Sequence, residues 1–107
     1  MKVLLDACVP RPLRRFLPDH SIHTAQEMGW GQLKNGALLQ EAEIQFEAFI
    51  TTDQNLKYQH KLVGRRLAIL VLPTNDWATI RTRVQEIAAR VATLKQGDFV
   101  ELDWLNP

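Results

Sequence analysis

Short apolar runs that predict strands recur along the chain. KVLL (residues 2–5) and AFIT (48–51) are each followed by polar residues, and SIHT (21–24) carries two β-branched residues after a turn signal. RLAILVL (66–72) is the longest of these runs, and its lack of alternation predicts burial on both faces of a parallel sheet. DFVELDW (98–104) alternates apolar with acidic residues, which is typical of an exposed edge strand.

Helical spacing of apolar residues fills the segments between these runs. It predicts a short amphipathic helix that ends at Pro18, a core-facing helix in residues 35–46, and the longest helix in residues 77–94. The polar segment 53–64 is expected to contain a helical turn around residues 56–61. The side chains expected to face the core are Leu13, Phe16 and Leu17 in the first helix, Leu38, Leu39, Ala42 and Phe46 in the second, and Ile80, Val84, Ile87, Val91 and Leu94 in the third.

Strands and helices alternate along the sequence, and this order predicts the fold class. Alternation is typical of α/β proteins, in which right-handed crossovers place helices on both faces of a parallel sheet. We therefore expect a three-layer α/β sandwich with a mostly parallel central sheet of about five strands. A chain of 107 residues is long enough to bury one core, so residues 1–107 are expected to form a single domain.

Composition narrows the function classes without selecting one. Hydrophobic residues make up 46% of the chain and the net charge is +1, so no overall charge attracts nucleic acid or a membrane surface. The only cysteine, Cys8, excludes an internal disulfide and is expected to be a small buried side chain. The apolar run at the start of the chain stops at Asp6, which is too early for a signal peptide or a membrane span, so a cytoplasmic location is expected.

Polar residues at the ends of the predicted strands are the best candidates for chemistry. Ligands of open parallel sheets bind outside the carboxyl ends of the strands, where the strand order reverses. Asp6 ends the first predicted strand, and Asp53 follows the third. If these strands are neighbours, two carboxylates face each other across a crevice and repel unless a cation or a shared proton lies between them. Mg²⁺ or Mn²⁺ is the expected partner, although each aspartate also has a simpler role as a turn or cap residue.

Basic residues close to Asp6 are candidates for phosphate contacts. Arg11, Arg14 and Arg15 form a cluster in the first predicted helix, and Thr52 lies beside Asp53. A solvated helix face is the simpler interpretation of the arginines. The three histidines lack the spacing of a zinc site.

The tryptophans leave two interpretations open. Trp30, between two glycines, either stacks on a nucleobase or covers the edge of the apolar core, and we prefer the second interpretation. Trp77 and Trp104 lie near predicted element ends, where they either cover the core or contact a second copy of the chain in a homodimer.

The motif VLLDACVPRPL followed by FITTDQNL resembles a compact branch of the PIN-like superfamily. In that family one strand ends in an aspartate before a proline-containing turn, and a later strand ends in a threonine-rich motif with a second aspartate. The resemblance covers nearly the whole chain and implies a Mg²⁺- or Mn²⁺-dependent ribonuclease. It further implies that the protein is the toxin of a pair, neutralised by a small antitoxin protein.

The sequence departs from the family pattern at two expected acids. Asn35 and Asn55 stand where the family places carboxylates, and asparagine offers a carbonyl oxygen without negative charge, so each replacement weakens cation binding. The resemblance thus implies metal ligands at Asp6, Asp53, Asn35 and Asn55, with Asp6 and Asp53 catalytic. RNA contacts are expected at Arg11, Arg14, Arg15, Thr52 and Lys57, and Glu27 or Asp76 is a candidate third acid.

Two alternatives to an active nuclease follow from these departures and from the fold class. One is a PIN-like module that binds RNA or protein with weakened or lost cleavage. The other is a response-regulator-like domain with an aspartate phosphoacceptor, which the missing second acid after the first strand and the missing lysine after a late strand disfavour.

Overall fold

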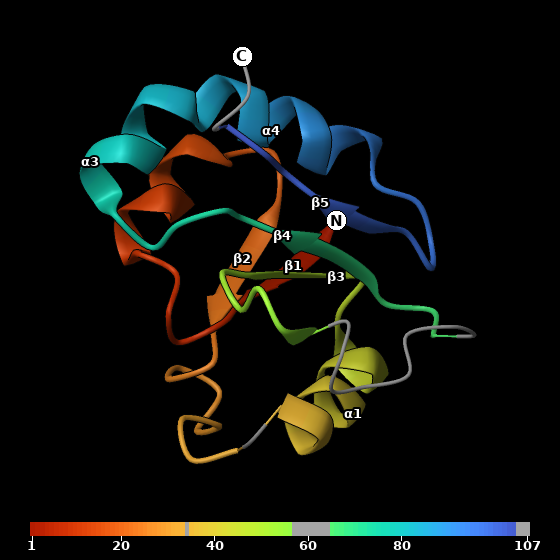
Figure 1. The fold of residues 1–107 in the computed structure, drawn as a ribbon. Coiled ribbons are helices and arrows are strands. Elements are labelled where there is room, and N and C mark those ends of the chain that lie inside the picture. Colours follow the sequence, from red (N-terminus) through yellow and green to blue (C-terminus); the bar gives the residue numbers. More distant parts are fainter. Residues whose placement is uncertain (34, 57–64, 105–107) are drawn as a thin grey trace.

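The strands of the computed structural model form one fully parallel sheet (Figure 1). The structure describes residues 1–33, 35–56 and 65–104. The strand order is β2-β1-β3-β4-β5, which confirms the predicted α/β class with a parallel sheet of five strands. The strands are β1 (Lys2–Leu5), β2 (Ser21–Thr24), β3 (Ala48–Thr51), β4 (Ala68–Val71) and β5 (Phe99–Glu101).

Helices cover both faces of the sheet and complete the predicted three-layer sandwich. The 3₁₀ helix η1 (Arg11–Phe16) lies on one face with α3 (Trp77–Ile80), η2 (Arg81–Arg83) and α4 (Val84–Thr93). The helix α1 (Asn35–Gln45) covers the opposite face. In Figure 1 the sheet runs across the middle, with α3 and α4 above it and α1 below it.

Each face of the sheet has its own apolar core because successive strand residues point to opposite sides. In β1, Val3 and Leu5 enter the first core, whereas Leu4 enters the second. The first core joins the sheet to η1, α3 and α4, and the second joins it to α1. Outside the sheet, the first core contains Leu13, Leu17, Ile80, Ile87 and Val91, and the second contains Leu38, Leu39, Ala42, Phe46 and Leu56.

The register of the central strands brings the predicted site residues to one edge. Leu5 of β1 pairs with Thr24 of β2 on one side and with Ile50 of β3 on the other. The Asp6 N–H continues the ladder, donating to the Ile50 carbonyl over 2.9 Å. The chain leaves β1 toward β2 and later returns to β3 on the other side of β1, so the strand order reverses between β1 and β3. Asp6 and β3 therefore meet at the topological switch point of the sheet.

The single long helix predicted for residues 77–94 is wrong, because the segment divides into α3, η2 and α4. The Thr82 hydroxyl donates to the Thr79 carbonyl over 2.7 Å, and such side-chain bonds to the backbone bend helices. Asp76 caps the start of α3, since its carboxylate accepts from the N–H of Thr79 over 3.2 Å. The apolar periodicity still placed Ile80, Ile87 and Val91 in the core.

The first predicted helix also differs from expectation. It forms as a 3₁₀ helix with Pro12 in its first turn, and Phe16 is 42% exposed instead of buried. The Phe16 ring lies 5.9 Å from the Trp77 ring, centroid to centroid. Of the helical turn predicted around residues 56–61, only Leu56 belongs to the described residues, and it is buried in the second core.

The preferred interpretation of Trp30 fits the structure. Its ring packs edge-on against Phe46 at a centroid distance of 6.0 Å and covers the second core. Trp77 and Trp104 similarly pack against the first core. Among residues 1–33, 35–56 and 65–104, no helix has the length and apolar character needed to cross a bilayer.

Candidate functional site

The hydroxyl of Thr51 links the two candidate aspartates at the switch point. Thr51 is the last residue of β3 and is fully buried. Its Oγ1 donates to Oδ2 of Asp6 over 2.7 Å and accepts from the backbone N–H of Asp53 over 3.1 Å. The strand order confirms that β1 and β3 are neighbours, and the hydroxyl lies between the Asp6 carboxylate and the Asp53 backbone. Threonine is common at strand ends, so the sequence pattern alone does not distinguish Thr51 as a site residue.

Local hydrogen bonds hold the Asp6 carboxylate in place. Its Oδ1 accepts from the N–H of Ala7 over 2.8 Å, and Cys8 Sγ lies 3.5 Å from Oδ2. Cys8 Sγ also lies 3.8 Å from the Thr51 hydroxyl. The expectation that Cys8 is buried is wrong, because the thiol is exposed at the mouth of the site. The turn after β1 places Val9, and neither Ala7 nor Cys8, in the first core. Composition alone does not predict which of these three residues is buried.

Asp53 begins a tight turn, as its simpler interpretation predicts. Its Oδ1 accepts from the N–H of Asn55 over 2.9 Å, an arrangement typical of an Asx turn. The Gln54 side chain crosses to β4, donating to the Leu72 carbonyl over 2.5 Å and to the Thr52 carbonyl over 3.1 Å. The turn holds the Asp53 backbone directly beside Thr51.

Of the other residues predicted to bind metal or RNA, some lie beside Asp53 and others do not. Asn55 is exposed next to Asp53, and Thr52 is half-buried beside it. Asn35 begins α1, on the face of the sheet covered by the second core, and its side chain and Lys57 lie outside the described part of the chain. Within the described ranges, no three His, Cys, Asp or Glu side chains gather in a group able to hold a metal ion.

Both candidate third acids have structural partners. Asp76 caps α3 with bonds to the N–H and hydroxyl of Thr79. Glu27 accepts from the N–H of Thr24 over 2.9 Å and forms an ion pair with Arg14. The hydrogen bond from Arg14, reinforced by the Thr24 N–H, holds the pKa of Glu27 below its usual range. Glu27 is therefore a carboxylate that anchors an arginine.

Two of the predicted phosphate-binding arginines line a pocket at the end of β2. Arg11 and Arg14 line it with three residues at and after the end of β2, and its volume is about 290 Å³. Nε of Arg14 is buried and has no hydrogen-bond partner. Arg15 is exposed on the same 3₁₀ helix. Because β2 adjoins β1, this arginine pocket lies one strand away from the aspartate pair. Its other lining residues are Thr24, Gln26 and Glu27.

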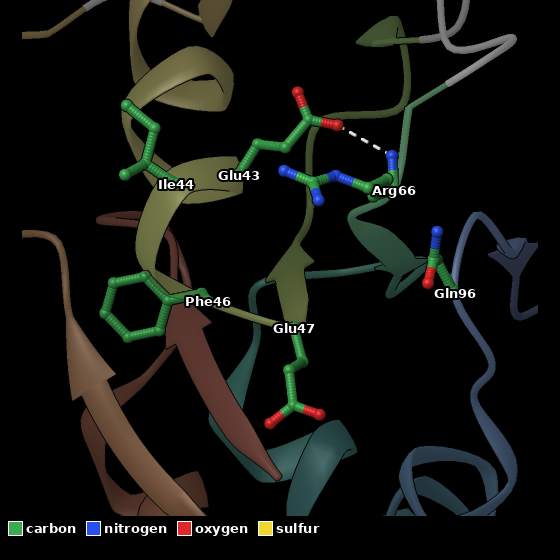
Figure 2. A pocket seen from close by; sticks show the side chains of 6 residues that line it. All are labelled: Glu43, Ile44, Phe46, Glu47, Arg66 and Gln96. Atoms are coloured by element: carbon green, nitrogen blue, oxygen red, sulfur yellow. Dashed lines mark hydrogen bonds between the residues drawn. The ribbon is translucent and has the colours of Figure 1, made fainter.

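A further pocket lies at the opposite, amino-terminal edge of the sheet (Figure 2). Figure 2 shows Glu43 beside Arg66, whose backbone N–H donates to the Glu43 carboxylate over 2.6 Å. Glu47, which directly precedes β3, accepts from the backbone N–H of Lys2 over 3.0 Å. These carboxylates tie together the starts of β1, β3 and β4. Ligands of parallel sheets bind at the other edge, so we assign this pocket a structural role.

Comparison with known proteins identifies no relative. No protein-family model, curated protein or solved structure matches the chain. The function is therefore inferred from the site itself. It combines the Asp6 carboxylate, held by the buried Thr51 hydroxyl, with Asp53, whose backbone N–H bonds the same hydroxyl, and with arginines one strand away. Such a set suits a hard cation and a phosphate-containing ligand.

Proposed function

We propose that the protein is a PIN-like, metal-dependent ribonuclease whose site is built on Asp6 and Asp53. The observation that carries this proposal is the Thr51 hydroxyl, which joins the ends of β1 and β3 at the switch point of the sheet. The fixed position of two acids at a ligand-binding edge favours a catalytic cluster over two unrelated turn residues.

The residues present fit Mg²⁺ or Mn²⁺. Both ions prefer oxygen ligands and are commonly held by one or two carboxylates, retained waters and substrate phosphates. Asp6 uses one oxygen for Thr51 and the other for Ala7, and each carboxylate oxygen can accept more than one bond. When bound, the ion would act as a Lewis acid toward the substrate phosphate and an attacking water. Thr51 orients Asp6 for this role.

The arginine pocket supplies the second half of the proposed site. A phosphodiester carries negative charge, and its charge increases on the oxygens during displacement, so guanidinium groups near the aspartates stabilise it. Arg14 is held in position by Glu27 and has an unpartnered Nε. Arg11 lines the same pocket and is exposed. RNA would then cross the carboxyl edge of β2, β1 and β3. As a toxin, the protein would be inhibited by an antitoxin that covers this edge.

A PIN-like binding module with weakened cleavage is the second candidate. It is favoured by the finding that the described residues contain no group of three potential metal-binding acids, histidines or cysteines. Asn55 stands beside Asp53 without adding charge. Such a protein binds RNA or a partner protein at the same edge and turns over slowly or not at all.

The strand order does not favour a phosphoacceptor domain over a nuclease. The order β2-β1-β3-β4-β5 is one of the two common doubly wound arrangements and is shared by proteins of unrelated function. The residues that follow β5 are Leu102, Asp103 and Trp104, so the lysine that this activity needs after a late strand is missing from the described part. We therefore retain the nuclease and the binding module.

Metal titration with matched variants tests the proposal. Mg²⁺ or Mn²⁺ is added to ¹⁵N-labelled protein, and amide shifts are expected to cluster at Asp6, Thr51 and Asp53. Cleavage of single-stranded RNA is then measured with and without the metal. Asp53→Asn should abolish both responses, whereas Asp19→Asn, the same charge change at an exposed loop residue, should leave both intact.

The outcomes separate the two candidates. Metal-dependent cleavage that is lost in Asp53→Asn supports the nuclease. Cleavage that appears only in the Asn35→Asp, Asn55→Asp double variant supports the weakened binding module. Activity that persists in Asp53→Asn, or metal shifts that avoid this edge, contradicts the proposed site.

A further inference from the structure

A second hollow lies at the carboxyl edge of the sheet, beyond β4. It has a volume of about 310 Å³, which is enough for a group the size of a nucleobase. The walls come from four places in the chain: the residues after β4, helix α3, the 3₁₀ helix η2, and the residues after β5. The lining residues are Pro73, Thr74, Thr79, Thr82, Arg83 and Trp104.

The aromatic wall of this hollow is held in a fixed position. Trp104 donates from Nε1 to Oε2 of Glu86 over 2.5 Å. The Arg83 guanidinium carbon lies 5.7 Å from the centroid of the Trp104 ring, and Arg83 also pairs with Glu86 over 3.5 Å. One carboxylate therefore positions both the indole and the guanidinium, the two kinds of planar group on which bases stack.

Three threonine hydroxyls give the hollow an ordered set of donors and acceptors. Thr79 donates its hydroxyl proton to Asp76, and Thr82 donates its own to the Thr79 carbonyl, so each oxygen keeps only acceptor capacity for a ligand. Thr74 Oγ1 accepts from the Asp76 N–H over 3.1 Å and keeps its own proton to donate. Mixed donors and acceptors beside an aromatic ring suit the edge of a base better than a phosphate.

A neighbouring hollow adjoins this pocket and extends toward the turn that contains Asp53. It is about 490 Å³ in volume, shares Pro73 with the tryptophan pocket, and extends to Gln54 next to Asp53. Glu101 and Asp103 also line it, so an intervening phosphate is disfavoured and uncharged parts of a ligand are preferred. From β3 to β5 the edge spans two strand spacings, on the order of 10 Å, a length comparable to the step from a phosphate to the base of the adjoining nucleotide.

We propose that the pocket of Trp104, Arg83 and the three threonines is a base-binding subsite for single-stranded RNA. As a substrate subsite it rests on the proposed function, because the RNA phosphate lies at Asp6 and Asp53 while a base beyond it stacks at Trp104. The binding step itself needs neither metal nor Asp53. Failure of one proposal is thus distinguishable from failure of the other.

The test uses AMP and UMP as probes, added at millimolar concentrations to ¹⁵N-labelled protein in EDTA. The indole N–H resonance of Trp104 and the amides of Thr74, Thr79 and Arg83 are expected to shift on binding. Trp104→Leu should raise the dissociation constant by about 5- to 150-fold, the range for loss of one base–aromatic stack. Trp104→Phe keeps a ring and should retain much of the affinity. Trp30→Phe, on the other core, is the control and should change nothing.

A second variant protects the test against misfolding of the C-terminal segment. Arg83→Gln keeps Trp104 and its bond to Glu86, and is expected to weaken nucleotide binding while the indole resonance stays in its folded position. Shifts that are absent, that lie outside the pocket, or that survive in both Trp104→Leu and Arg83→Gln overturn the subsite, whatever the nuclease assay shows. Binding at Trp104 without RNA cleavage supports the subsite and counts against the nuclease alone.

Discussion

Thr51 has a buried hydroxyl with partners on two sides, and each partner belongs to a different part of the candidate site. It donates to the Asp6 carboxylate and accepts from the Asp53 backbone. A valine has nearly the same shape but makes neither bond. The contribution of this residue is therefore testable without changing any charge.

Thr51→Val is expected to lower the free energy of unfolding by about 1–3 kcal/mol, because two hydrogen bonds are lost, one from the half-buried Asp53 N–H and one to the Asp6 carboxylate. It should also weaken Mg²⁺ or Mn²⁺ binding, since the Asp6 carboxylate loses the hydroxyl that fixes one of its oxygens. Urea denaturation and metal titration measure the two effects.

Thr24→Val is the matched control for this prediction. Thr24 is also a buried threonine at a strand end, and its hydroxyl accepts from the Glu27 N–H over 3.1 Å. Its loss should reduce stability while leaving metal affinity near the wild-type value. Equal metal affinity in both variants would show that Thr51 is only a structural residue.

The sequence predicted the two aspartates of the site but not how they are held. Asp6 and Asp53 are recognisable because each follows an apolar run. The donors that fix them depend on the strand register, which a local pattern does not contain. The same limit applies to Arg14, whose pairing with Glu27 depends on the position of the loop after β2.

At the scale of the elements, strands were predicted better than helices. The residues 2–5, 21–24 and 48–51 form strands with the expected boundaries, because each run is delimited by turn or polar residues. The apolar spacing continues through the break between α3 and α4 and so does not reveal it, whereas the non-helical backbone angles of Arg83 and the Thr82 bond to the Thr79 carbonyl accompany it.

The conformation of Gly97, like the break between α3 and α4, is not predicted by the spacing of apolar residues. Gly97 lies in the turn before β5 with φ +84°, and a Cβ placed there would meet the Arg65 carbonyl oxygen at 3.2 Å. Gly97→Ala is expected to destabilise the protein by about 1–2 kcal/mol, the cost of a left-handed backbone for a non-glycine residue. The melting temperature measures this change.

Gly31→Ala provides the control for the turn. A Cβ at Gly31 meets nothing within 4 Å, and its φ is not in the left-handed region. The variant should therefore keep or slightly raise the melting temperature, by reducing the freedom of the unfolded chain. A Gly97→Ala variant as stable as Gly31→Ala would contradict the strained turn.

At the scale of the whole molecule, the two apolar cores share one sheet, and this arrangement favours the predicted single domain. Leu39 of α1 and Ile87 of α4 are both fully buried, and they lie on opposite faces of the sheet. Any loosening of β1 or β3 affects both cores at once. The two faces are therefore expected to unfold together.

Leu39→Ala and Ile87→Ala should each lower the free energy of unfolding by about 2–5 kcal/mol, as large-to-small changes in cores do. Their effects should add in the double variant, since the two residues share no core. Ile44→Ala, at a 75% exposed position of α1, is the control and should stay within about 0.5 kcal/mol. Two separate unfolding transitions in any variant would contradict a single domain.

The parallel sheet has a kinetic consequence. Every strand pair among residues 1–33, 35–56 and 65–104 is parallel, so none of these pairs is a β-hairpin that could form early, and each first requires closure of a long loop. The central pair joins Leu4 to Phe49, which are far apart in the chain. Contacts of such high sequence separation slow folding, and the edge that carries the proposed site is assembled only when β1 and β3 meet. Until then Asp6 and Asp53 are separate solvated side chains, so any activity of the proposed site is expected to appear only after this late step.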